Sequence, residues 1–113
     1  MFGFKNTAEK NAQKTVQFTM QIIGQKTGLD PTKLPNELRD RILTNTLKGG
    51  TDNKYDFCAQ YMTGFAFVLH GMKRKDESDR VLHALIDFVE GNKKNMTLSA
   101  YDECQAIFKS AAP

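Results

Sequence analysis

Residues 52–72, DNKYDFCAQYMTGFAFVLHGM, hold most of the bulky apolar side chains of this chain and decide its fold class. The apolar positions recur at helical spacing and cover most of the helix circumference, which is typical of a helix packed against several others. We therefore predict a central helix that begins at Asp52 (or Thr51) and ends near Met72. The core side chains predicted from this helix are Tyr61, Phe65, Val68, Leu69 and Met72.

Four further segments have the spacing of amphipathic helices and lie between capping residues, glycines and prolines. They are residues 7–27, residues 37–48 after a cap at Asn36, a segment from Asp76 or Ser78 to Glu90, and a segment from Thr97 or Ser99 to about Ser110. No segment alternates apolar and polar residues, and the chain has no Asn-Gly or Asp-Gly hairpin signal. We predict an all-α fold: a compact bundle of about five helices, forming a single domain over residues 1–113, with a buried central third helix.

Length and charge narrow the class of protein. The chain has 113 residues, enough for one hydrophobic core, and its net charge of +3 is lower than expected of a dedicated nucleic-acid binder. The longest apolar run, residues 64–69, is too short to cross a membrane, and the first residues lack the apolar segment of a secretion signal. We expect a cytoplasmic protein without membrane contact in which Cys58 and Cys104 are reduced, with a disulfide between them as the open alternative.

A polar stripe with one large aromatic side chain marks the other face of the central helix. It consists of Asp56, Gln60, Thr63, Phe67 and His70, which share one side because they follow one another at spacings of three or four residues. Gly64 and Gly71 lie beside the stripe and would permit close approach of another molecule. Such a face suits a protein interface or a small-ligand groove, with Phe67 as its apolar anchor. The alternative is that Phe67 packs beneath another helix of the same domain.

A second group of residues could bind a divalent metal. Asp79, His83 and Asp87 share the outer face of the fourth predicted helix, and carboxylates one turn either side of a histidine are suitable ligands. Ligands on one straight helix cannot surround an ion, however, and no second helix carries a matching Glu-x-x-His motif. A solvated charged face is the favoured interpretation, so we predict no metal site.

Basic residues offer a further alternative, contact with nucleic-acid phosphates. The candidates are Lys10, Lys14, Lys73, Arg74 and Lys75. Three acidic residues follow within positions 76–79, and the third predicted helix is too apolar to serve as an exposed recognition helix. Nucleic-acid binding is therefore less favoured than a protein interface at the Phe67 stripe.

No phosphate-binding loop, serine nucleophile elbow or zinc-protease motif occurs in the chain, so nothing positively indicates an enzyme or a cofactor. We expect a non-catalytic helical protein-interaction module that binds a protein partner or itself, as a homodimer, through the Phe67 stripe. The alternatives are a weak nucleic-acid-associated protein and a domain that binds a divalent metal or a small ligand.

Overall fold

The computed structural model describes the backbone of residues 2–50 and 52–111 and the side chains of residues 12–50 and 52–110. Within these residues the chain forms five α-helices and two short 3-10 helices. In order they are α1 (Phe2–Thr27), η1 (Pro31–Lys33), α2 (Asn36–Lys48), α3 (Lys54–Gly71), α4 (Lys75–Gly91), η2 (Lys93–Asn95) and α5 (Leu98–Ala111). The described residues contain no strand, and the prediction of an all-α bundle is confirmed.

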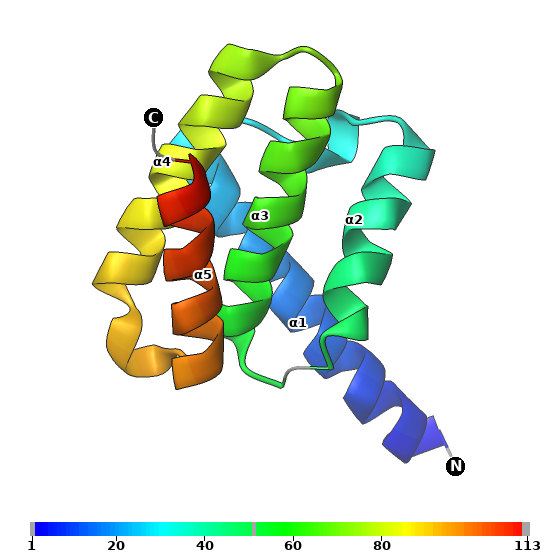
Figure 1. Cartoon of the computed structure of the whole chain (residues 1–113). Coiled ribbons are helices and arrows are strands. Elements are labelled where there is room, and N and C mark those ends of the chain that lie inside the picture. The colour runs from blue at the N-terminus through cyan, green and yellow to red at the C-terminus, as the bar shows by residue number, and fades with distance from the viewer. Residues whose placement is uncertain (1, 51, 112–113) are drawn as a thin grey trace.

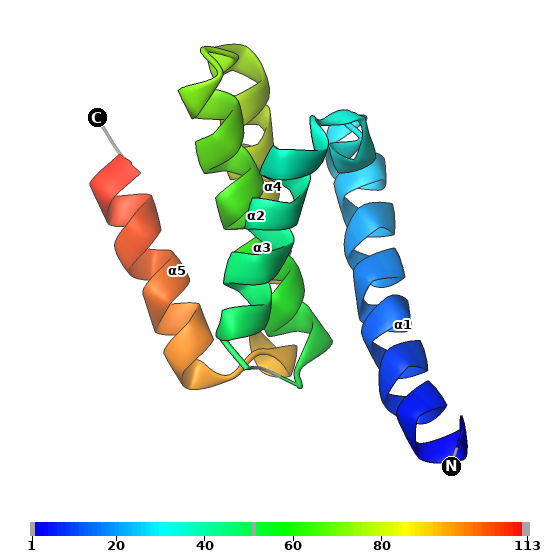
Figure 2. The same cartoon turned by 90° about the vertical axis from the view of Figure 1, so that its right-hand side faces the viewer.

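The helices are arranged in three layers (Figures 1 and 2). The middle layer contains α2, α3 and α4 side by side, with α3 between the other two; α1 lies behind this layer and α5 lies in front of it. Each of the other four α-helices contacts α3, as expected for the most apolar helix of the chain. The predicted central position of the third helix is confirmed.

The hydrophobic core surrounds α3. Its largest fully buried apolar side chains are Phe65, Met62 and Leu69 of α3, Phe88, Leu85, Val81 and Val89 of α4, Ile23 of α1 and Ile42 of α2. Among the predicted core positions, Tyr61, Phe65 and Leu69 are buried, whereas Val68 and Met72 are half-buried. These two lie nearer the front face, where α5 does not cover α3 completely.

Several helix boundaries differ from the predicted ones. The N-cap of α3 is Asn53 rather than Asp52 or Thr51, because its side-chain oxygen accepts hydrogen bonds from the amides of Tyr55 (2.9 Å) and Asp56 (3.1 Å). Helix α4 already begins at Lys75, and Ser78 is not its cap: the Ser78 hydroxyl donates to the carbonyl of Ala66 at 2.7 Å and links α4 to α3. Helix α1 extends back to Phe2, since no proline interrupts the residues before Thr7.

The close contact between α2 and α3 depends on a glycine. A methyl group built on Gly64 would lie 3.2 Å from Cγ2 of Ile42, a β-branched side chain that is 2% exposed. The direction in which a Gly64 side chain would point is therefore occupied by Ile42 of the same chain, so the missing side chain permits the close approach of α2. At Gly71 no atom lies within 4 Å of the corresponding position.

Two glycine-to-alanine variants test this contact. Gly24→Ala should raise the free energy of unfolding by about 0.5–1 kcal/mol, because alanine favours the helix and nothing lies within 4 Å of the added methyl group. Gly64→Ala should lower it by about 1 kcal/mol, since the stiff Ile42 side chain must be displaced. Urea denaturation measures both. An equal gain in the two variants would show that the α2–α3 contact tolerates a side chain at position 64.

Candidate functional site

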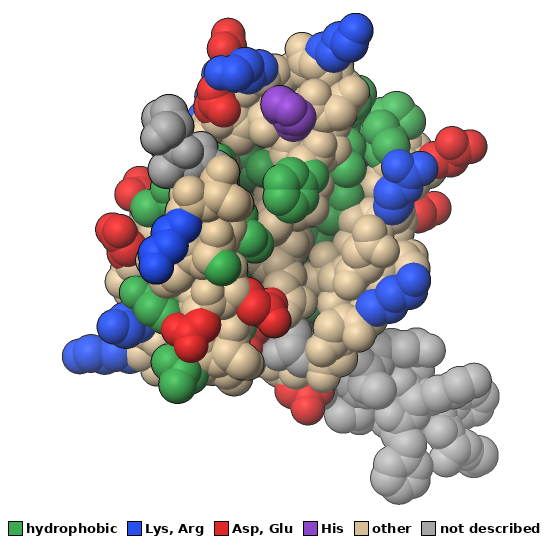
Figure 3. All heavy atoms as spheres, in the orientation of Figure 1, with side chains coloured by type: hydrophobic (Ala, Val, Ile, Leu, Met, Phe, Trp, Pro, Cys, Tyr) green, Lys and Arg blue, Asp and Glu red, His purple; other side chains and the backbone are tan. Residues whose placement is uncertain are grey.

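A groove crosses the front of the bundle, where α5 leaves part of α3 uncovered (Figure 3). Its lower part is a cavity of about 610 Å³ between α2, α3 and α5, and its upper part is a cavity of about 430 Å³ between α2 and α3. Ile42, Asn45, Gly64 and Phe67 line both cavities, so the two form one continuous surface. We call this surface the α2–α3–α5 groove.

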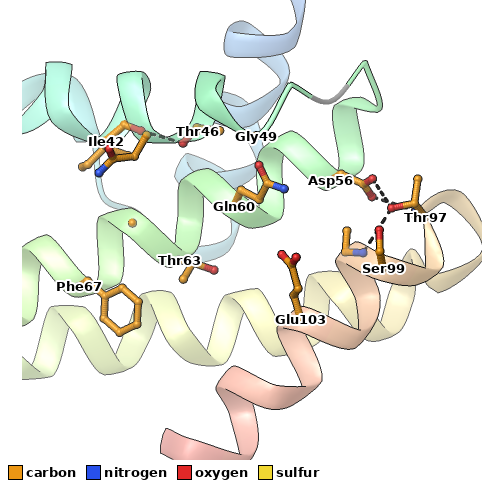
Figure 4. A pocket seen from close by; sticks show the side chains of 13 residues that line it. Ile42, Thr46, Gly49, Asp56, Gln60, Thr63, Phe67, Thr97, Ser99 and Glu103 are labelled. Atoms are coloured by element: carbon orange, nitrogen blue, oxygen red, sulfur yellow. Dashed lines mark hydrogen bonds between the residues drawn. The ribbon is translucent and has the colours of Figure 1, made fainter.

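Four of the five residues of the predicted stripe line this groove. Asp56, Gln60, Thr63 and Phe67 follow one another along the side of α3 that faces it (Figure 4). His70, the fifth member, is exposed and lines neither cavity. Helical spacing therefore located the α3 side of the groove. It did not distinguish the exposed side chains of this stripe from the buried ones.

Phe67 is the most unusual residue of the groove. Its side chain is 63% exposed although it lies on the most apolar helix, and it stands where the two cavities meet. No helix of the described chain packs over it, so Phe67 does not pack beneath another helix of its own domain. Exposing a large aromatic side chain is unfavourable in water, and a second molecule that covered it would remove that cost.

Asp56, in contrast, is a buried structural residue, not a free binding group. It is 2% exposed, and its carboxylate accepts hydrogen bonds from the amide of Thr97 at 3.1 Å and from the Thr97 hydroxyl at 2.6 Å. The same hydroxyl accepts from the amide of Ala100 at 3.3 Å, which caps α5. A negative charge at a helix N-terminus is favourable, so Asp56 fixes the start of α5 against the first turn of α3. The prediction that Asp56 belongs to an open binding face is therefore wrong.

A neighbouring hydrogen bond strengthens the same junction. The Asn53 side-chain nitrogen donates to the carbonyl of Asn95 at 2.7 Å, in the short η2 turn that precedes α5. The lower end of the groove is thus held by two side chains, one from the N-cap of α3 and one from its first turn, which anchor the start of the α5 wall.

Two hydroxyl groups in the groove also have partners within the chain. The Thr63 hydroxyl donates to the carbonyl of Ala59 at 2.9 Å, and the Thr46 hydroxyl donates to the carbonyl of Ile42 at 2.7 Å. Hydroxyls bonded to their own helix are poorly placed to bind substrate or to act as nucleophiles. These two threonines therefore offer little free hydrogen-bonding capacity, whereas, among the described residues, no hydrogen bond is found for the side chains of Gln60 and Asn45, which also line the groove.

Sequence reasoning missed the two walls of the groove. The α2 wall contains Leu38, Arg41, Ile42 and Asn45, and the α5 wall contains Ser99, Ala100 and Glu103. The helical repeat indicates which residues of α2 share a side, but which side meets α3 depends on contacts distant in sequence. Nothing in the spacing of α5 indicated that Glu103 would project towards α3, as it does in Figure 4.

The residues of the metal alternative do not come together. Asp79 is paired with Lys75, at 3.3 Å between the carboxylate oxygen and Nζ, while His83 and Asp87 are exposed on the surface of α4. Across the described residues, no group of three or more histidine, cysteine, aspartate or glutamate side chains is arranged to hold an ion.

The basic loop is largely neutralised by neighbouring acids. Arg74 makes two short contacts to the Glu77 carboxylate, 2.6 Å and 2.7 Å, and this hydrogen bonding lowers the pKa of Glu77. Lys75 is the partner of Asp79, so Lys73 is the one cation of this loop for which no ion pair is found among the described side chains. Lys14 is exposed on α1, and the Lys10 side chain lies outside the described residues.

Neither cysteine is suited to nucleophilic chemistry. Burial raises the pKa of the Cys58 thiol to about 12, and burial together with the charges of Glu103 and Asp56 raises the pKa of the Cys104 thiol to about 11. Both therefore stay protonated near neutral pH, and a protonated thiol is a weak nucleophile. Both are free thiols in the structure.

No family model, curated protein or solved structure matches this chain. Among the described helices, none is both long enough and apolar enough to span a bilayer. The function is accordingly inferred from the residues and the geometry described above.

Proposed function

We propose that this protein is a non-catalytic helical interaction module that associates with a second copy of itself through the α2–α3–α5 groove. The observation that carries the proposal is the position of Phe67. An exposed aromatic side chain stands directly beside two cavities on the same face, so the face offers both a projecting group and a space to receive one. A surface with both features is suited to an isologous dimer, in which each copy contributes the same patch.

The composition of the groove supports protein contact over catalysis. The Thr63 hydroxyl and the Asp56 carboxylate already have internal partners, and the upper cavity is walled mainly by apolar side chains such as Leu38 and Met72. Interfaces use buried aromatic anchors of this kind, surrounded by polar groups at the rim. We place the module in the cytoplasm, where a reducing environment keeps Cys58 and Cys104 as thiols.

Static light scattering over a range of protein concentrations tests this proposal. The chain has a mass of 12.8 kDa, and we expect the average mass to approach twice that value at high concentration and to fall on dilution. Moderate salt should be used, so that non-specific charge effects are screened. A mass that stays at the single-chain value at every concentration would overturn the proposal.

A further inference from the structure

The two walls of the α2–α3–α5 groove carry opposite charges. Arg41 lines the upper cavity from α2, and Glu103 lines the lower cavity from α5. Both residues are exposed, and neither belongs to an ion pair found among the described side chains. Figure 3 shows both positively and negatively charged side chains projecting from the α2 side of this face, and negatively charged ones from the lower part of α5.

This arrangement is self-complementary under two-fold symmetry. A two-fold axis that passes through the interface close to Phe67 places the Phe67 side chain of each copy beside the cavities of the other. If the axis also runs between the two walls of the groove, it brings α2 of each copy against α5 of the other. Every contact then occurs twice, as in any isologous interface.

We propose that the second copy docks with the two-fold axis close to Phe67, so that Arg41 of each copy pairs with Glu103 of the other. This inference rests on the proposed self-association and adds to it the orientation of the two chains. The apolar contact at the centre supplies most of the affinity, and the two flanking ion pairs select the register, since charges at the rim contribute to specificity more than to affinity.

Charge reversal provides a direct test, using Arg41→Glu and Glu103→Arg as separate variants. In a homodimer of either variant, both ion pairs become like-charge contacts, so the dissociation constant should rise by about tenfold or more at low salt. In a mixed dimer, the new carboxylate at position 41 of one copy faces the new guanidinium at position 103 of the other. The second pair of the mixed dimer joins the unchanged Arg41 and Glu103. Both pairs again have opposite charges, and the dissociation constant should return to within about threefold of the wild-type value.

Sedimentation equilibrium of each variant alone, of the equimolar mixture and of the wild type gives the four dissociation constants. Recovery in the mixture supports the proposed pairing and also shows that both variants are folded. Wild-type affinity in the single variants, or a failure of the mixture to recover wild-type affinity, would overturn the pairing. If the wild type still forms a concentration-dependent dimer in that case, the proposed self-association stands. A wild type that is monomeric throughout would overturn both.

Discussion

Replacing Asp56 with asparagine should lower the free energy of unfolding by about 2–3 kcal/mol, a large fraction of the stability of a domain of this size. The carboxylate is 2% exposed and accepts two hydrogen bonds from Thr97, one from the amide and one from the hydroxyl. An asparagine has one acceptor oxygen and no charge, so at least one of these bonds and the favourable interaction with the N-terminus of α5 are lost. Chemical denaturation measures the change.

Asp87→Asn is the matched control, because it makes the same chemical change at an exposed position of α4. It should alter stability by no more than about 0.5 kcal/mol. Thr97→Val removes one partner of the carboxylate, and the double variant should be less destabilised than the sum of the single effects, since both substitutions remove the same bond. Equal stabilities of Asp56→Asn and Asp87→Asn would show that the junction between α3 and α5 is not held by this carboxylate.

The contact between Asp56 and Thr97 could be predicted from the sequence only in part. The spacing of residues 56–70 placed Asp56 correctly on the same side of α3 as Phe67, because helical periodicity is a local property. Its burial, however, is caused by Thr97, which is 41 positions further along the chain. A contact over that distance has no local signal, so a buried capping residue looked like a member of an open polar face.

The same distinction applies to the rest of the molecule. The five helices and the central position of α3 follow from hydrophobic spacing, caps and short connections, and each was predictable. The N-cap of α3 was misplaced by one or two residues, because Thr51, Asp52 and Asn53 are all good N-caps and the choice among them depends on side-chain geometry. The Arg41 and Glu103 walls were not predictable, since they depend on how α2 and α5 pack against α3.

Replacing Phe67 with serine should weaken self-association by a few hundredfold, which corresponds to about 3–4 kcal/mol because each dimer loses two central aromatic side chains. The stability of the single chain should change by no more than about 0.5 kcal/mol, since the Phe67 side chain is 63% exposed before association. Loss of the dimer without loss of folding would distinguish an interface residue from a core residue.

Leu47→Ser is the matched control, because Leu47 is another large apolar residue that is more than half exposed, at 56%. Leu47 comes two residues after Asn45, which lines the groove. On a helix of 3.6 residues per turn, two residues point to nearly opposite sides. The control therefore removes exposed apolar surface from α2 without changing the proposed interface.

Sedimentation equilibrium of wild type, Phe67→Ser and Leu47→Ser, under identical conditions, tests the central claim most directly. We expect wild type and Leu47→Ser to dimerise with similar dissociation constants, and Phe67→Ser to remain at the single-chain mass of 12.8 kDa over the same concentrations. Dimerisation of Phe67→Ser with the wild-type dissociation constant would contradict the claim that this groove is the surface through which the protein associates.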